Sequence, residues 1–354
     1  MIDTVGLLQR LSEAFGPSGF EDDVRDIITE VVTPLVDDIH VDPLGNVLAT
    51  RRGRREDVLM LDAHMDEVGF LVSYVEESGF LRLSPLGGWD ARVLPAHAVT
   101  VAGRDGGRVR GVVGTLPPHV TQESERSKAF KLEDLFVDIG ATSRAEAEAM
   151  GVEVGCACVP GYPFERLDDD LVMGKAFDDR AGCTVAIGAL DALGETEPEL
   201  TLVFAFTISE ELGLRGARTA AQQLQPRIAL ALEGTTAVDV PGVTGARKLA
   251  SMGAGPTVTI ADRSIIASRA VVTLLEETAS KNGIPFQRKL PGGGGTDAGA
   301  IQTAGAGALV GVVSVPCRYI HAPLSLVRPS DVDAAIRLVT GFVEGAASLV
   351  TAAS

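Results

Sequence analysis

An adjacent pair of glutamates, Glu210 and Glu211, closes the apolar run TLVFAFTIS, which predicts a buried strand. Two carboxylates at the end of a buried strand are costly unless both have partners or tasks. Because successive strand side chains point to opposite faces, we expect the two residues to differ in role, one binding a metal ion and the other facing substrate as a general base. A solvated strand end is the alternative for this pair taken alone.

Three other apolar runs end in residues that bind metals. VLMLDA leads into His64, IALAL leads into Glu233, and GALVGVVSVPCRYI leads into His321. A further acidic residue, Asp178, lies just before the helical stretch AGCTVAIGALDAL. Ligands gather at the carboxyl ends of the strands in parallel sheets, so we expect all these side chains to meet at one edge.

The residue types indicate which metals fit. Two imidazoles with several carboxylates suit Zn²⁺, Co²⁺ or Mn²⁺, and the absence of thiolates argues against a purely structural zinc site. Two cations about 3.5–4 Å apart require a bridging carboxylate, and Asp178 is well placed for it. Asp66 follows His64 by two residues, so we expect it on the same strand face, where it would orient the imidazole.

Strands and helices that alternate along the chain would position these residues. Residues 1–72 and 164–354 combine strands with helical stretches, which predicts an α/β domain with a mostly parallel mixed sheet flanked by helices. Residues 73–163 instead show short strands separated by turn pairs, which predicts an inserted β-rich unit. The basic run 51–55 predicts a hairpin turn between VLAT and VLML, and the polar stretch 117–131 predicts a loop.

Composition limits the classes of function. The 354 residues are 45% hydrophobic, and the net charge of −17 argues against a nucleic-acid partner, which needs clustered Lys and Arg. No apolar segment reaches the ~18 residues of a membrane span, and the N-terminal stretch lacks the features of a signal peptide, so we expect a cytoplasmic protein. We expect the four cysteines to be small core residues rather than disulfide partners.

A family resemblance follows from the motifs LDAHMDEVG, GKAFDDRAG, FAFTISEELGLRGA, ALEGTTAVDVPG, GGGGTDAGAIQ and RYIHAP. Together they resemble the tetrahedral (TET) and glutamyl aminopeptidases, dinuclear metallopeptidases that assemble as dodecamers. The resemblance runs nearly end to end and includes KLEDLFVDIGA. It implies a zinc-peptidase-like catalytic domain formed by residues 1–72 and 164–354, with a PDZ-like dimerisation domain at 73–163.

The resemblance also implies roles for individual residues. His64 and Glu233 would hold one metal, Glu211 and His321 the other, and Asp178 would bridge them. Glu210 would be the general base or acid that acts through the bridging water, and Asp66 would support His64. The family further implies a cis peptide after Asp66, and places the glycine run 292–295 near the active site.

The expected reaction is removal of N-terminal residues from short peptides, with Zn²⁺ or Co²⁺ as cofactor. In much of the wider clan the aminopeptidases carry Asp where this chain has Glu233, and Glu is familiar there in carboxypeptidases and deacylases. A dinuclear metallo-carboxypeptidase or an N-acyl amino-acid hydrolase is therefore the alternative. A cellulase with Glu210 and Glu211 as its acids fits poorly, because neighbours on opposite strand faces do not flank one bond. A non-catalytic scaffold is disfavoured by the complete ligand set.

Overall fold

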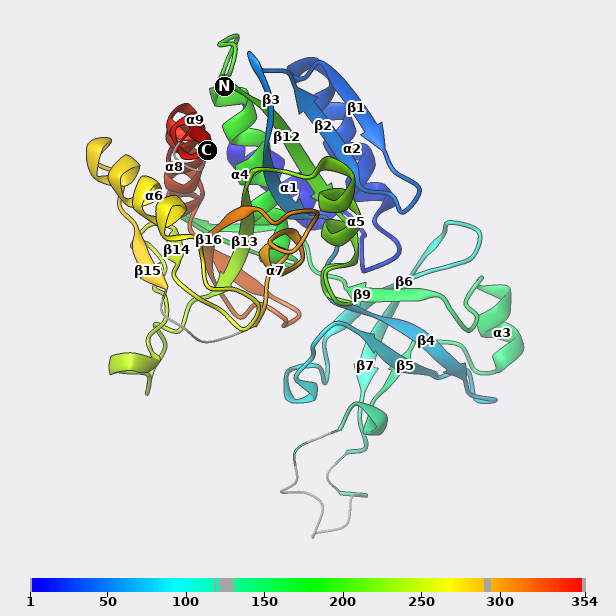
Figure 1. Cartoon of the computed structure of the whole chain (residues 1–354). Coiled ribbons are helices and arrows are strands. Elements are labelled where there is room, and N and C mark those ends of the chain that lie inside the picture. The colour runs from blue at the N-terminus through cyan, green and yellow to red at the C-terminus, as the bar shows by residue number, and fades with distance from the viewer. Residues whose placement is uncertain (1, 118, 121–128, 130, 290–293, 352–354) are drawn as a thin grey trace.

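The computed structural model describes residues 2–117, 119–120, 129, 131–289 and 294–351. A large sheet is covered by helices on both faces, and a smaller closed barrel stands to one side of it (Figure 1). The sheet has eleven strands in the order β1-β2-β12-β3-β13-β16-β17-β11-β10, with β14 paired to β16 and β15 paired to β14. Its strands are β1 (Asp38–Val41), β2 (Val47–Arg51), β3 (Arg55–His64), β10 (Glu165–Asp168), β11 (Leu171–Gly174), β12 (Leu200–Thr207), β13 (Ile228–Thr236), β14 (Thr257–Thr259), β15 (Gln287–Lys289), β16 (Leu309–Arg318) and β17 (Ser325–Val327).

The sheet is mixed rather than mostly parallel, which corrects the prediction in part. The four central strands β12, β3, β13 and β16 run parallel, as strand–helix alternation requires. The outer strands β1, β2, β17, β11 and β10 pair antiparallel, because short connections such as the one between β1 and β2 allow only a reversal of direction.

The predicted hairpin at residues 51–55 is wrong. Strand β12 lies between β2 and β3 and pairs with both, antiparallel to β2 and parallel to β3. The connection therefore crosses the start of β12, where Gly53 approaches the backbone closely. A Cβ at Gly53 would lie 2.2 Å from the Leu200 carbonyl oxygen, so only glycine fits this crossing.

The two faces of the sheet bury different side chains. Along β12, Phe204 and Phe206 point into the larger core, against the face covered by α1, α2, α4, α6 and α8. Val203 and Ala205 point into the smaller core, under the alanine-rich helices α5 and α7. The helices of this domain are α1 (Thr4–Glu13), α2 (Asp22–Val32), α4 (Phe177–Ala192), α5 (Arg215–Leu224), α6 (Arg269–Lys281), α7 (Ala298–Ile301), α8 (Pro329–Gly345) and α9 (Ala347–Thr351).

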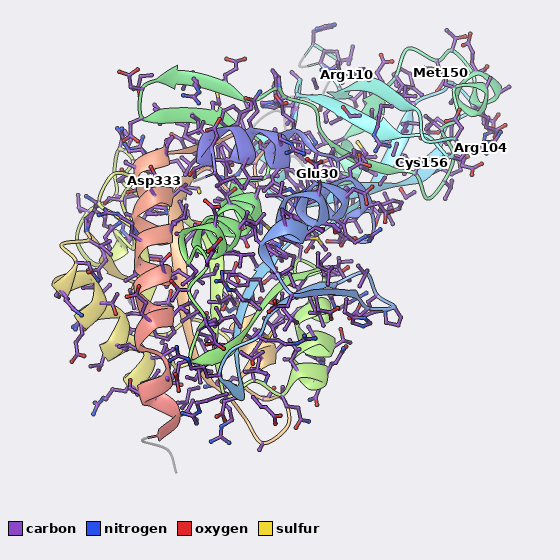
Figure 2. All side chains as sticks on the ribbon, turned by 90° about the horizontal axis from the view of Figure 1, so that it is seen from above. Glu30, Arg104, Arg110, Met150, Cys156 and Asp333 are labelled. Atoms are coloured by element: carbon purple, nitrogen blue, oxygen red, sulfur yellow. The ribbon has the colours of Figure 1, made fainter. Side chains whose placement is uncertain are left out.

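The inserted unit is a closed six-stranded barrel in the order β4-β5-β8-β7-β6-β9, with its own apolar core. Seen from above, Arg104 and Met150 at the outer end of this unit lie far from Asp333 on α8 (Figure 2). Its elements are β4 (Gly69–Val75), β5 (Leu81–Leu86), β6 (Ala98–Ala102), β7 (Arg108–Gly114), β8 (Phe136–Asp138), the helix α3 (Arg144–Ala149) and β9 (Ala157–Pro160). The likeness to a PDZ domain stays a prediction.

Other composition-based expectations have mixed outcomes. All four cysteines are free and buried, which confirms their assignment to the core. None of the helices in the described part of the chain is both long and apolar enough for a membrane span. The predicted loop at 117–131 lies largely outside the described residues.

Candidate metal centre

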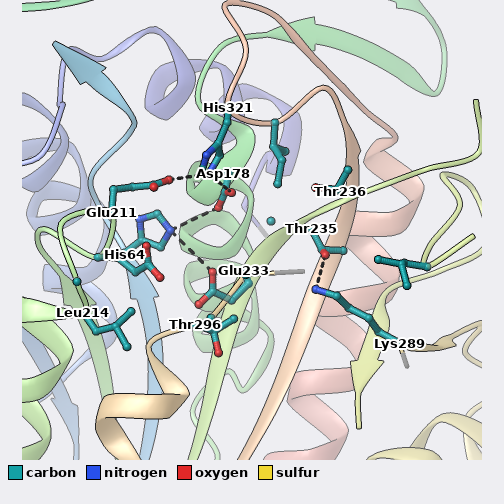
Figure 3. Close-up of a pocket in the computed structure, with 17 residues that line it drawn as sticks. His64, Asp178, Glu211, Leu214, Glu233, Thr235, Thr236, Lys289, Thr296 and His321 are labelled. Atoms are coloured by element: carbon teal, nitrogen blue, oxygen red, sulfur yellow. Dashed lines mark hydrogen bonds and ion pairs between the residues drawn. The ribbon is translucent and has the colours of Figure 1, made fainter. Parts of the chain in front are cut away.

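Six side chains meet at the carboxyl edge of the parallel strands, around a cavity of about 620 Å³ (Figure 3). They come from different elements. One is the last residue of β3, one lies on β13, one at the start of α4 and one in the loop after β16. The remaining two lie in the turn after β12. We call these residues the ligand cluster: His64, Asp178, Glu210, Glu211, Glu233 and His321.

Asp178 lies between the two imidazoles. Its Oδ1 is 3.4 Å from His64 Nε2, and its Oδ2 is 3.4 Å from His321 Nε2. On one side, His64 Nε2 is also 3.8 Å from a carboxylate oxygen of Glu233; on the other, His321 Nε2 is 3.0 Å from one of Glu211. Each of these two trios has ligand atoms within 4.8 Å of one another and contains Asp178; a third trio, His64, Glu210 and Glu211, meets the same limit without it.

The imidazoles are held by groups outside the ligand cluster. The Nδ1 of His64 lies 3.1 Å from the carbonyl of Asp66 and 3.3 Å from its Oδ1. The Nδ1 of His321 lies 3.0 Å from the carbonyl of Gly88, in the inserted unit. Because a carbonyl oxygen only accepts, each ring donates from Nδ1, and once it loses its second proton it presents the Nε2 lone pair to the ligand cluster.

Glu210 and Glu211 do not lie on a strand, so the expectation of opposite faces is wrong. β12 ends at Thr207, and Ser209 takes a positive φ of 52° that turns the chain. Asp66 stabilises this turn: its Oδ1 accepts from the Glu210 amide at 3.0 Å and its Oδ2 from the Glu211 amide at 3.2 Å. Both glutamate side chains therefore line the same cavity.

Asp66 likewise lies beyond the strand, because β3 ends at His64. The predicted cis peptide after Asp66 is wrong: the cis bond joins Asp178 and Asp179. There, consecutive carboxylates serve different partners. Asp178 faces the imidazoles, whereas Asp179 accepts from the backbone amide of His64 at 3.2 Å and from that of Gly182 at 3.0 Å.

The same segments carry a second group of charges that the sequence did not reveal. Glu67 Oε1 lies 2.5 Å from Lys175 Nζ and 3.4 Å from an Nη of Arg180. All three side chains are at most 5% exposed. We call them the buried ion cluster. They lie among backbone carbonyls, with Lys175 donating to Ala14 and Arg180 donating to Leu11.

The pKa values show that the ligand cluster lacks positive charge. Burial raises the pKa of Glu210 to about 9 and raises that of Glu233 well above its ordinary value. Burial alone would lower the pKa of His321, but contacts with Asp178 and Glu211 raise it to about 11. Without bound cations the cluster therefore retains protons at neutral pH. Carboxylates and imidazoles that converge without thiolates fit a centre for divalent cations such as Zn²⁺ or Co²⁺.

Further residues line the cavity beyond the ligand cluster. Gly294 and Gly295 lie there, as the resemblance implied, whereas residues 292–293 of that glycine run lie outside the described residues. Lys289, Thr235 and Thr296 also line it. The sequence did not predict these three residues. Lys289 lies in β15, a strand of only three residues, and neither Lys289, Thr235 nor Thr296 is a residue type typical of metal ligands.

Comparisons with known proteins identify relatives along most of the chain. The model of the M42 glutamyl aminopeptidase family matches residues 45–338. The lysyl aminopeptidase of Pyrococcus furiosus is 33% identical, with 96% of each chain covered. The structure of a TET aminopeptidase from a marine sediment thaumarchaeote is 40% identical, covers 96% of each chain and has a TM-score of 0.94.

Two further structures bear on assembly and on reaction type. The TET1 peptidase of Pyrococcus horikoshii is 31% identical over 96% of this chain and 99% of that one, with a TM-score of 0.86. It is described as a dodecamer, and as able to form a tetrahedron or a large octahedral shell. A Thermotoga maritima protein named an endoglucanase is 34% identical, covering 96% of this chain and 97% of that one, with a TM-score of 0.78.

Proposed function

This chain belongs to the M42 glutamyl aminopeptidase family, and from that premise we propose that it removes N-terminal residues from short peptides with the help of two divalent cations, Zn²⁺ or Co²⁺. The observation that carries the proposal is the position of Asp178, whose two oxygens face two different imidazoles. A carboxylate shared by two sets of donors is what a pair of neighbouring cations requires.

The ligands would divide between two cations. His64 and Glu233 would hold one, Glu211 and His321 the other, and Asp178 would bridge them, which follows the two trios that share Asp178. When bound, the cations would polarise the scissile carbonyl and lower the pKa of a water molecule. The chain's own part is to hold both imidazoles with Nε2 facing the site, through Asp66 and Gly88.

Glu210 is the residue proposed to move the proton. It lines the cavity but belongs to neither trio that contains Asp178. In the metal-free protein its pKa of about 9 keeps it protonated at pH 7, so it can act as a base only when nearby positive charge lowers that pKa. Its carboxylate would then take a proton from the attacking water and deliver it to the leaving amine.

The inserted unit, predicted at residues 73–163 and formed by the barrel that begins at Gly69, is proposed as the oligomerisation domain, and the chain as a dodecamer. The assemblies described for the Pyrococcus horikoshii relative support this. A cytoplasmic location is proposed from the cysteines, because all four are free, and disulfides are rare in reducing compartments.

A metallo-carboxypeptidase or N-acyl amino-acid hydrolase is the second candidate, favoured by the glutamate at position 233. The two candidates differ in the end of the peptide that they need. We would therefore digest one unblocked peptide and its N-acetylated twin with protein reconstituted with Zn²⁺ or Co²⁺, and follow the products by mass spectrometry. Stepwise loss from the free amino end, with the acetylated peptide intact, is expected. Release from the carboxyl end, or deacetylation, would establish the second candidate instead.

A further inference from the structure

The two imidazoles of the ligand cluster are held by different parts of the molecule. His64 is the last residue of β3, its side chain is 1% exposed, and its Nδ1 contacts Asp66, two residues away. His321 lies in the loop after β16, and its side chain is 36% exposed. Its Nδ1 faces the carbonyl of Gly88 at 3.0 Å, 233 residues away along the chain. The orientation of this second imidazole therefore depends on the inserted unit.

The loop that carries His321 needs this outside support. Tyr319 and His321 both take a positive φ, of 65° and 56°, in a region that residues other than glycine rarely adopt. A backbone conformation of this kind persists only where the surrounding contacts hold it. The contact with Gly88 is therefore part of what keeps Nε2 of His321 directed at Asp178 and Glu211 (Figure 3).

The turn at residues 87–89 contacts two residues of the ligand cluster. Gly87 has a φ of 79°, and a Cβ added to it would lie 3.1 Å from a carboxylate oxygen of Glu211. A Cβ added to Gly88 would lie 3.4 Å from Nδ1 of His321. The backbone can come this close because neither residue has a side chain. Glu211 and His321, the two ligands proposed for the second cation, thus share one support.

Trp89 fixes this turn to the barrel. Its ring stacks on Phe70, with ring centroids 4.8 Å apart and planes 21° apart, and its Nε1 donates to the carbonyl of Gly69 at 3.0 Å. Phe70 is only 1% exposed and belongs to the apolar core of the barrel. A stacked pair and an indole hydrogen bond hold both ends of the Trp89 side chain. Trp89 also lines a small cavity together with Asp178 and His321.

We propose that Trp89 is a positioning residue for the second cation. By fixing the 87–89 turn to the barrel, it keeps the Gly88 carbonyl where His321 can donate to it from Nδ1. The proposal rests on the proposed pair of cations and specifies that only one of them depends on the inserted unit. The first cation does not need Trp89, because Asp66 orients His64.

A purely structural role for Trp89 would give a different result. If Trp89 served only to pack the barrel, its loss would lower the stability of the fold and leave both metal affinities unchanged or equally weakened. A positioning role instead requires a loss of affinity that is confined to one of the two ions.

The first test titrates metal-free wild type, Trp89→Leu and Trp89→Phe with Co²⁺ against a competing chelator, and takes both dissociation constants from the visible absorption of bound Co²⁺. Trp89→Leu should weaken one ion by about tenfold or more, as for residues that orient ligands, and the other by less than about twofold. Trp89→Phe keeps the ring but loses the hydrogen bond, so it should weaken the same ion by only about threefold. Phe80→Leu, which breaks the contact of Phe80 with Phe136 elsewhere in the barrel, is the control and should change neither affinity.

A double-mutant cycle then assigns the affected ion. In a His321→Ala background, Trp89→Leu should not weaken the remaining ion further, whereas in a His64→Ala background it should still do so. If Trp89→Leu does not fold, Trp89→Phe carries the same test. Equal weakening of both ions, unchanged affinities, or an effect of Trp89 that persists in His321→Ala would overturn the proposal.

These titrations need no substrate, so they separate this proposal from the aminopeptidase proposal. A wild type that holds two ions but cleaves no unblocked peptide would refute the aminopeptidase proposal alone. A wild type whose metal binding is unchanged by His321→Ala would overturn both.

Discussion

The buried ion cluster comes from two segments, 64–67 and 175–180, that also carry His64 and Asp178 of the ligand cluster, yet the two clusters handle charge differently. In the buried ion cluster, Glu67 contacts both Lys175 and Arg180. In the ligand cluster, four carboxylates face only two imidazoles, and protons occupy the site in the absence of metal. The buried ion cluster holds its carboxylate against two cations of the same chain, whereas the ligand cluster is short of positive charge and is suited to receive cations from outside.

The largest effect is expected at the proton-transfer residue. Glu210→Gln should lower kcat by about a thousandfold, within the range of 10²–10⁴ for loss of a general base, because glutamine cannot accept the proton. Metal content should not change, since the two trios that contain Asp178 stay intact. Glu148→Gln, on the exposed surface of α3, is the matched control for the measurement of kcat and bound metal. A loss below tenfold would remove Glu210 from the proposed role.

Breaking the buried ion cluster should cost stability whether or not metal is bound. Glu67→Gln would leave Lys175 and Arg180 without their carboxylate, at a cost of about 3–5 kcal/mol in the free energy of unfolding. Urea denaturation with and without Zn²⁺ should show the same loss. Glu197→Gln, which breaks an exposed pair with Arg54, should cost at most about 1 kcal/mol. A loss seen only with metal would show that the two clusters are not separate.

Loss of a carboxylate from the ligand cluster should have the opposite effect on the stability of the metal-free protein. Glu233→Gln removes a buried carboxylate whose pKa is raised by burial, so the metal-free protein should become more stable at pH 8. Metal affinity should fall by at least about tenfold, the smallest loss typical of residues that only orient ligands. Competition with a chromogenic chelator and urea denaturation measure the two quantities. Destabilisation of the metal-free variant would contradict the account.

Per pH unit and per proton, the pH dependence of the metal-free protein is the smallest of these effects. The folded state keeps a proton on Glu210 up to a pKa of about 9, whereas the unfolded chain loses it near 4.5. The unfolding free energy should therefore fall as pH rises from about 5 to 9, by at most about 1.4 kcal/mol per pH unit for each such proton. The lowered pKa values of Asp66 and Asp178 act only at lower pH. Denaturation at pH 6, 7 and 8 in a chelator should show this fall, and added metal should reduce it.

The candidate site could be predicted from sequence because apolar runs show where parallel strands end. His64, Glu233 and His321 each lie within three residues of a strand end or inside one, and the sheet brings such positions together. The order of strands could not be predicted in the same way. β12 separates β2 from β3 through long-range pairing, which leaves no local signal at residues 51–55.

Contacts between residues far apart in the sequence also could not be predicted. Nothing local pairs Glu67 with Lys175, more than a hundred residues away, or brings Gly88 of the inserted unit to His321. The turn at Ser209 depends on Asp66 accepting the amides that follow it, so the alternation expected of a strand failed at Glu210 and Glu211. Lys289 lies in a three-residue strand, too short to show a pattern.

The count of bound metal ions tests the central claim most directly. Protein equilibrated with excess Zn²⁺ or Co²⁺, dialysed and analysed by elemental mass spectrometry should hold two ions per chain. Asp178→Asn, which weakens the carboxylate common to both trios, should hold fewer than two, while Glu210→Gln keeps both. A wild type with one ion or none, or an Asp178→Asn protein that retains two with unchanged affinity, would contradict the account.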